Sequence, residues 1–275
     1  MTDFVTFALT PAGLRDATLA IAACRAGGIG IVNGELVTST ESVCDTMDTL
    51  ARQVNSAYGV KLDAIDATLG TCLLSHAQRG LRWLIVDAEQ VPDQQDLIAK
   101  LRAAGVQVLA ELKTPQWPGA SLETLVDGLW LKGNEAGGFV GEDASFILLQ
   151  KWRTRTQLPL YVRGGLTPHS AAACSAIGIA GGVLDSQLLM LDEARLPESL
   201  RALLRNLSGS ETVAVGDGEL GEYFRLLVRP GHVAAREFVN TGEARQFPAL
   251  RTLVQGKTDW SRPEQSLLPI GQDVA

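Results

Sequence analysis

Long apolar runs and clusters of basic residues are both absent from this sequence of 275 residues. No apolar stretch approaches the ~20 residues that a membrane-spanning helix needs. Asp3 stands where a signal peptide would carry positive charge. The net charge of −7, without a Lys/Arg run, argues against nucleic acid and anionic membranes as main partners. We therefore expect a cytoplasmic protein with neither kind of partner.

Cysteine and histidine are also scarce and scattered. No CxxC pair or other metal-ligand spacing occurs among the four cysteines and three histidines, which are Cys24, Cys44, Cys72, Cys174, His76, His169 and His232. Widely spaced thiols of this kind are typical of reduced cysteines in a cytosolic protein. The sequence predicts no metal site.

Short apolar runs alternate with helix-like segments through most of the chain. Eight such runs predict strands, at Phe4–Leu9, Gly28–Val32, Tyr58–Leu62, Trp83–Val86, Val106–Leu112, Gly128–Leu131, Leu160–Val162 and Gly182–Leu184. Their starts lie 22–32 residues apart, which suits one strand, one helix and two short loops. The alternation predicts an α/β fold with a parallel sheet covered on both faces. Eight units favour closure into a (β/α)8 TIM barrel, although an open doubly wound sheet has the same periodicity.

The alternation of strand-like and helix-like segments ends after about Met190. We expect a barrel core over residues 1–192, and over 193–275 a closing helix with an irregular extension packed on the barrel. Pro197–Leu207 is the predicted helix, Ser208–Glu222 is rich in glycine and acids, and Tyr223–Val228 suits a strand or a helix. The chain stops at Pro269–Ala275 without an obvious closing element, so we expect a piece of a longer polypeptide.

Two glycine-rich regions follow predicted strands, at the end of the barrel where active sites are built. Gly133–Gly141 has four glycines in its nine residues, and suits a backbone held close to a flat or anionic ligand. Val162–Pro168 turns on Gly164 and Gly165 and opens a helix with Thr167 as N-cap and Pro168 as its first residue. Such a helix N-terminus suits phosphate.

Two charged residues complicate the phosphate interpretation. Arg163 can add positive charge to the site or serve as an ion-pair partner at the surface. Asp185 places a negative charge next to the site unless its side chain points away.

Gly28–Gly34 is a weaker candidate for a ligand-binding loop, because it enters a strand whereas a dinucleotide-binding loop leaves one.

Taken in order, these segments resemble the nitronate monooxygenase family, formerly the 2-nitropropane dioxygenases, and the related FMN-dependent enoyl-ACP reductases. The resemblance covers roughly residues 4–190. It is carried by Thr10–Gly13, Ala26–Gly30, the Glu135–Gly138 loop and the two phosphate-loop segments.

The resemblance implies that FMN lies across the C-terminal mouth of the barrel. The residues that it places at the cofactor are Thr10, Pro11, Ala12, Lys61, Lys113, Gly137 and Gly138 for the flavin ring, and Gly164, Gly165, Gly182, Ser186 and Gln187 for the phosphate. Lys61 and Lys113 stand at strand ends, where a cation can stabilise a reduced flavin. The alternative for both is a solvent-facing charge.

The chain departs from the family pattern at two places. Phe139 stands where active members usually have the histidine of a Gly-Gly-His loop, and phenylalanine cannot exchange a proton. Ser186-Gln187 replaces the Gly-Thr that normally closes the phosphate site. No catalytic residue is assigned, and Glu135 is the nearest candidate in sequence for handling a proton.

Asn134 and the ending Pro269–Asp273 are similar to barrel domains embedded in polyketide or polyunsaturated fatty acid synthase-like multienzymes. This similarity implies acyl substrates, with an acyl carrier protein or neighbouring synthase domains as partners. We expect an FMN-dependent oxidoreductase domain of the nitronate monooxygenase or enoyl reductase type. A degenerate, noncatalytic barrel that serves as a docking or structural module is the alternative. Classical nitronate monooxygenase activity is a third interpretation, and it needs a replacement base.

Overall fold

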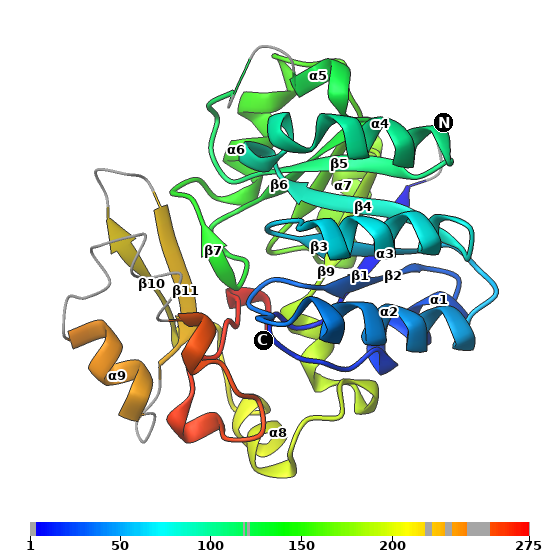
Figure 1. Cartoon of the computed structure of the whole chain (residues 1–275). Helices are drawn as coiled ribbons and strands as arrows, with labels where there is room; N and C mark the ends of the chain where they lie inside the picture. The colour runs from blue at the N-terminus through cyan, green and yellow to red at the C-terminus, as the bar shows by residue number, and fades with distance from the viewer. Residues whose placement is uncertain are drawn as a thin grey trace.

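Eight parallel strands close into a barrel in the computed structural model, which describes residues 4–117, 119, 122–217, 222–228, 233–240 and 254–274 (Figure 1). The barrel strands are β1 (Val5–Leu9), β2 (Ile29–Asn33), β3 (Tyr58–Leu62), β4 (Leu81–Asp87), β5 (Gln107–Leu112), β6 (Gly128–Lys132), β8 (Leu160–Arg163) and β9 (Gly181–Leu184). β1 pairs with both β2 and β9, which closes the barrel. The predicted (β/α)8 barrel is confirmed, and the open doubly wound sheet is excluded.

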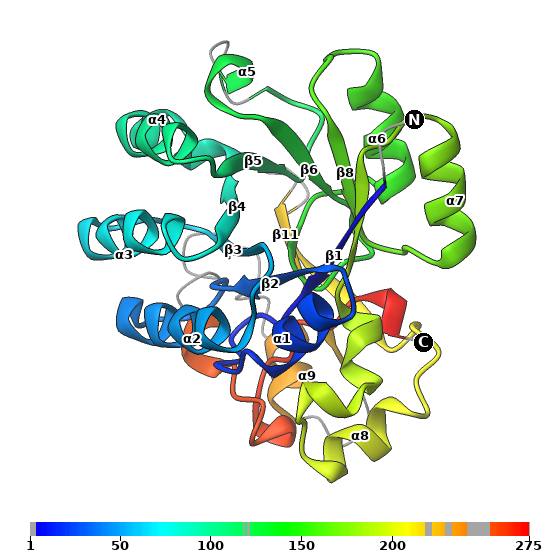
Figure 2. The same ribbon diagram turned by 90° about the vertical axis from the view of Figure 1, so that its right-hand side faces the viewer.

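Helices cover the outside of the barrel between successive strands (Figure 2). They are α1 (Thr18–Arg25), α2 (Thr40–Gln53), α3 (Ala67–Ala77), α4 (Gln95–Ala103), α5 (Leu122–Leu125), α6 (Ser145–Arg153) and α7 (Pro168–Ala176), with the 3-10 turns η1 (Ala88–Gln90) and η2 (Pro92–Gln94) before α4. The predicted start of α7 is confirmed, because Thr167 caps the helix through Ser170 and Pro168 is its first residue. None of the helices in the described ranges has the length and apolar content that crossing a bilayer requires.

Aromatic side chains fill the interior of the barrel. The Phe7 ring lies 5.0 Å from Trp83, 5.1 Å from Trp130 and 5.5 Å from Tyr161, centroid to centroid. These offset and edge-on contacts are the arrangements that aromatic rings prefer. The barrel interior below the mouth is therefore a packed core.

The chain beyond the barrel builds a small second sheet. Its elements are η3 (Ser186–Met190), η4 (Asp192–Ala194), α8 (Glu198–Leu204), β10 (Thr212–Asp217), β11 (Glu222–Leu227), α9 (Val233–Asn240), η6 (Pro263–Gln265) and η7 (Gln272–Val274). β10 and β11 pair antiparallel, and β11 also pairs with β7 (Gly138–Val140), which belongs to the loop after β6. The helix expected within 197–207 is present as α8.

Within the glycine- and acid-rich stretch Ser208–Glu222, residues 212–217 form strand β10. Antiparallel pairing with β11 makes these residues a regular strand, which the glycine and acidic residues do not predict. Of the expected tail, residues 218–221, 229–232, 241–253 and 275 lie outside the described residues. The division into 1–192 and 193–275 stays a prediction, and the sheet β10-β11-β7 takes strands from both parts.

Candidate functional site at the barrel mouth

Charged side chains meet at the C-terminal ends of the barrel strands, where catalytic residues of such barrels usually lie. Six buried ones, each 7% exposed or less, form ion pairs with one another, and we call them the mouth network: Glu35, Lys61, Glu111, Lys132, Arg163 and Asp185. Four stand at or near the ends of β3, β5, β6 and β8, and Glu35 and Asp185 follow β2 and β9. The parallel strands bring these distant residues to one place because all of them end on the same side of the barrel.

Lys61 is a cation of the mouth network that pairs with three carboxylates. Its Nζ lies 3.2 Å from Glu35 Oε2 and 3.3 Å from Glu111 Oε1. It also donates to Asp63 Oδ1 at 2.8 Å, at the rim of the mouth. Although burial alone would lower its pKa, Asp63, Glu111 and Glu35 together raise the pKa of Lys61 above its ordinary value. Lys61 is therefore held charged.

Arg163 connects the other side of the network. Its Nε donates to Asp185 Oδ2 at 2.7 Å, and its Nη1 lies 3.5 Å from Glu111 Oε2 and 3.9 Å from Glu35 Oε2. The pKa of Asp185 is lowered, because Arg163 outweighs the effect of burial. The structure thus decides between the two roles left open for Arg163: it is an ion-pair partner, but a buried one. Asp185 points toward Arg163.

Lys132 is the most weakly held cation. Its Nζ contacts only one carboxylate of the network, Glu35, at 3.3–3.4 Å. Burial, together with repulsion from Arg163, lowers the pKa of Lys132 to about 8. For Glu35 the balance is the reverse: burial raises its pKa, but Lys132, Lys61 and Arg163 outweigh burial and bring it well below the ordinary value. Glu35 is surrounded by three cations, whereas Lys132 contacts one carboxylate. This contrast explains why the charged form is favoured for Glu35 and disfavoured for Lys132.

The glycines of the 133–141 loop lie against atoms of the protein itself. A Cβ on Gly138, whose φ is +83°, would stand 2.5 Å from Glu35 Oε1. A Cβ on Gly137 would stand 2.2 Å from the Pro269 carbonyl oxygen. Because glycine has no Cβ, the Glu35 carboxylate can approach Gly138, and the Pro269 backbone can approach Gly137, more closely than any side chain at these positions would permit.

The predicted phosphate turn faces a carboxylate of the chain. Gly164 and Gly165 have φ values of +109° and +65°, and Glu135 Oε2 lies 3.4 Å from the position of a Cβ on Gly164. The Glu135 carboxylate accepts hydrogen bonds from Ser145 N at 2.9 and 3.1 Å, at the start of α6. The Glu135 carboxylate therefore occupies the N-terminus of α6, where the helix dipole favours a negative charge. The Ser145 hydroxyl also donates to Glu135 Oε1, at 3.2 Å, so Glu135 has a structural role at the start of α6.

The residues after β9 are likewise occupied by internal contacts. Ser186 Oγ accepts a hydrogen bond from Gly271 N at 2.8 Å. The Gln187 side chain donates to the Leu166 carbonyl at 2.9 Å and accepts from Asp185 N at 3.0 Å. A Cβ on Gly182 would meet Leu166 Cδ2 at 2.4 Å.

The Thr10–Ala12 stretch is covered in the same way. Thr10 Oγ1 accepts from Asn33 N at 2.9 Å, and the Ala12 carbonyl accepts from Trp260 Nε1 at 2.9 Å. A cavity of about 10 Å³ remains beside Thr10, Pro11 and Ala12. That volume holds about one water molecule.

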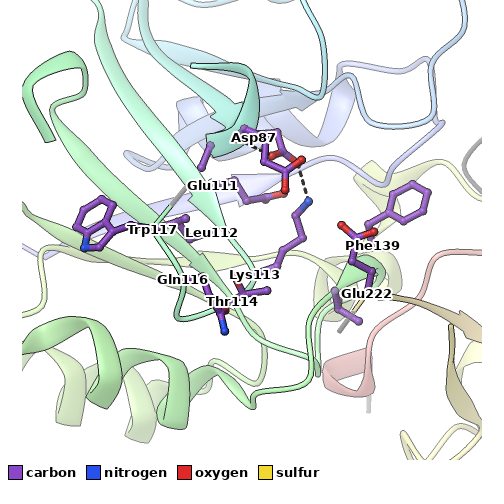
Figure 3. Close-up of a pocket in the computed structure, with 12 residues that line it drawn as sticks. Asp87, Glu111, Leu112, Lys113, Thr114, Gln116, Trp117, Phe139 and Glu222 are labelled. Atoms are coloured by element: carbon purple, nitrogen blue, oxygen red, sulfur yellow. Dashed lines mark hydrogen bonds and ion pairs between the residues drawn. The ribbon is translucent and has the colours of Figure 1, made fainter. Parts of the chain in front are cut away.

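A larger hollow of about 110 Å³ lies beside the mouth network (Figure 3). On one side, Asp87 Oδ2 accepts a hydrogen bond from Lys113 Nζ at 2.6 Å, and Glu111 lies next to this pair. Phe139 and Glu222 line the opposite side. Phe139 is buried, packs on Phe224 with ring centroids 5.0 Å apart, and donates its N–H to Glu35 Oε1 at 3.2 Å.

FMN does not fit this arrangement. Sites for ligands of its size usually enclose about 300–1,000 Å³, whereas the two hollows among the predicted cofactor residues enclose about 110 and 10 Å³. The cations that a phosphate would need are paired with carboxylates, and Glu135 faces the predicted phosphate turn. Of the twelve residues named for FMN, all but Gly182 stand near or after the C-terminal ends of barrel strands; Gly182 lies within β9, opposite Thr6 of β1. Their individual roles stay predictions.

Sequence reasoning missed Glu35, Glu111, Lys132 and the C-terminal residues that cover the mouth. A signal was present for some of them. Lys132 directly follows the predicted strand Gly128–Leu131, and Glu111 interrupts the apolar run of Val106–Leu112. Charged residues at the ends of buried strands point to the mouth of a barrel. No comparable signal marks the C-terminal residues.

The fold of the chain is shared with several solved structures. FabK from Thermotoga maritima superposes with a TM-score of 0.78 at 20% identity, covering 99% of this chain and 86% of FabK. Nitroalkane oxidase from Streptomyces ansochromogenes has a TM-score of 0.74 at 18% identity, covering 99% and 90%. The fold is that of the FabK and nitroalkane oxidase barrels. At these identities the likeness confirms the predicted resemblance at the level of the fold.

A similar domain also occurs in a polyketide system. The enoyl reductase domain of MlnA, from the macrolactin biosynthesis cluster of Bacillus amyloliquefaciens, has a TM-score of 0.64 at 11% identity, covering 94% of this chain and 69% of that domain. No family model matches the chain.

Two curated relatives carry the same name, (3aS,4S,5R,7aS)-5-hydroxy-7a-methyl-1-oxo-octahydro-1H-indene-4-carboxyl-CoA dehydrogenase. The protein from Rhodococcus jostii is 30% identical over 182 residues, which is 64% of this chain and 49% of the relative. The protein from Mycobacterium tuberculosis is 25% identical over 208 residues, 74% of this chain and 58% of the relative. The chain spans about half the length of the curated relatives it matches.

Proposed function

We propose that this chain is a noncatalytic member of the oxidoreductase barrels, acting in the cytoplasm as a structural or docking module of a multienzyme. The mouth network is the observation that supports the proposal. Three buried carboxylates and three buried cations stand where the resemblance puts the flavin, and they satisfy one another. In a barrel that uses FMN, the cofactor itself would supply the redox chemistry, and the protein would supply the space and the polar contacts.

Desolvation adds a physical reason. Opening the mouth to a phosphate would require breaking at least one buried ion pair, and removing one partner from such a pair costs about 3–5 kcal/mol. Phe139 gives the barrel no proton donor at the usual position. The same packing that closes the mouth stabilises the fold without a ligand, which suits a module whose role is structural.

Absorbance of the purified protein, followed by calorimetric titration with FMN, tests the proposal. We expect a colourless protein and no binding heat at micromolar FMN. A flavin band, or tight FMN binding that Gly164→Val abolishes, contradicts it. Gly178→Val is the matched control, because Gly178 has a similar φ of +82° at the end of α7 and lies in open space.

The comparisons favour a second candidate, an FMN-dependent oxidoreductase that acts on acyl thioesters. The curated relatives are named as dehydrogenases of an indene-carboxyl-CoA compound, and one structural neighbour is an enoyl reductase domain of a polyketide cluster. An acyl carrier protein or a neighbouring synthase domain would then present the substrate. This candidate requires FMN binding in the titration above, together with a mouth that opens from the arrangement described.

A further inference from the structure

The last described residues of the chain, 267–274, form a cover over the mouth beside β9. Figure 1 shows this red segment between the barrel and the β10-β11 pair. Two of its backbone N–H groups hold it in place: Gly271 N donates to Ser186 Oγ, and Gln272 N donates to the Glu135 carbonyl, both at 2.8 Å. On its other side, the Leu268 carbonyl accepts from Leu227 N of β11 at 3.0 Å. We call residues 267–274 the cover.

A pair of carboxyl groups joins the cover to the mouth network. Asp273, in η7, lies close enough to Asp185, which precedes η3, for the two charges to interact. Asp185 is buried, and both carboxyl oxygens of Asp273 are buried without a hydrogen-bond partner among the described residues. Two ionised carboxylates have no proton to share, and with both ionised neither oxygen of Asp273 has a hydrogen-bond donor. The contact is therefore a bond only when one of the two carries a proton.

The surroundings of the two carboxyl groups favour Asp273 as the one that carries this proton. Asp185 has Arg163 Nε at 2.7 Å and the Ser186 N–H, both of which favour its charged form. Burial and the neighbouring charge of Asp185 raise the pKa of Asp273 well above its ordinary value, and Arg163 offsets this only in part. Like charges in a shared buried site are a known cause of one strongly raised carboxyl pKa.

We infer that the protonated Asp273 carboxyl is a pH-sensitive latch that holds the cover on the barrel mouth, and that its ionisation releases the cover. Two negative charges would then face each other in a buried site. Ser186, Arg163 and the Thr10–Ala12 stretch, which border the small cavity beside Pro269, would become accessible. This inference is independent of whether the mouth takes FMN.

The surrounding charges determine the direction of the pH dependence. Asp185 and Arg163 face Asp273 from the barrel side, and Arg225 of β11 faces it from the second sheet. Arg225 donates to the backbone carbonyls of Asn134 and Thr212 through Nε and Nη1. Because the pKa of Asp273 is raised in the folded state, its contribution is present at low pH and is lost as the pH rises through that pKa.

Hydrogen–deuterium exchange of the cover, measured between pH 5 and pH 9 and corrected for the intrinsic pH dependence of exchange, tests the latch. In the wild type, protection of the Gly271 and Gln272 amides should fall about tenfold for each pH unit above the pKa of Asp273. Asp273→Asn should keep the cover protected across the range, because the amide can donate to Asp185 without ionising. Asp93→Asn, at an exposed site in η2, should behave like the wild type.

Two outcomes would overturn the latch. One is wild-type protection that does not change with pH, and the other is the same slope in Asp273→Asn. Infrared spectroscopy provides a test that does not depend on how the variant folds. The wild type should show a carboxylic-acid band at pH 6, about two units above the ordinary aspartate pKa, and the absence of this band contradicts the proposal.

Discussion

Glu35→Gln is the sharpest test of the mouth network. The substitution keeps the size of the side chain and an oxygen that can accept from Phe139 N–H, but removes the charge. Lys61 retains Asp63 and Glu111, and Arg163 retains Asp185 and Glu111. Lys132 loses the only carboxylate within ion-pair distance of it in the described part of the chain.

The expected cost is that of a buried ion pair with one partner removed, about 3–5 kcal/mol. A loss of 1 kcal/mol lowers the melting temperature by roughly 2–4 °C in proteins of 150–250 residues. Multiplying the two ranges gives a decrease of roughly 6–20 °C at pH 7. Glu193→Gln, at an exposed position in η4, should leave the melting temperature within 1–2 °C of the wild type, in the range of ordinary surface substitutions of about ±0.5 kcal/mol.

The difference between wild type and Glu35→Gln should narrow at both ends of the pH scale. At low pH, the contribution of Glu35 disappears as the pH falls through its lowered folded-state pKa. At high pH, the penalty for burying Lys132 decreases. Its folded-state pKa, about 8, lies below the unfolded value of about 10.4, so the unfolded state binds more protons in between and stability rises with pH.

Calorimetric or circular-dichroism melting between pH 3 and pH 10 measures both effects. The reasoning is refuted if Glu35→Gln melts within about 2 °C of the wild type at pH 7. It is also refuted if the deficit grows steadily from pH 7 to pH 10.

Two further predictions concern the glycine loop and its neighbour. Gly137→Ala should lower the free energy of unfolding in urea by about 1–3 kcal/mol, because the new Cβ would stand 2.2 Å from the Pro269 carbonyl oxygen; Gly256→Ala, in open space, is the control. An unchanged value would mean that the cover moves away at little cost. Phe139→His should melt lower than the wild type, because it leaves an imidazole in the apolar contact with Phe224. Oxygen uptake with a nitroalkane and FMN should stay at background in this variant, and turnover would show that the mouth opens.

The sequence by itself determined the alternation of parallel strands and helices and favoured a barrel, whereas the strand pairing in the structure decided its closure. Apolar runs recurring every 22–32 residues made parallel strands the physical solution, and the Thr167-Pro168 signature located the start of α7. Such signals are local: a strand buried on both faces must be apolar along its length, and a helix start needs a cap. The strand between Thr212 and Asp217 could not be predicted in this way, because its regularity comes from pairing with β11.

Only the tertiary structure decided what fills the mouth. The glycines at 137, 138 and 164 signalled close approach, and the sequence alone suggested a ligand as the approaching group. In the folded chain the approaching atoms are the Pro269 carbonyl, the Glu35 carboxylate and Glu135. A glycine in the sequence indicates that some group comes close to the backbone, but not which group. The approaching residue lies up to 132 positions away in sequence, as for Gly137 and Pro269. A contact across that separation depends on the closed barrel, because closure brings strand ends and the C-terminal cover to one place.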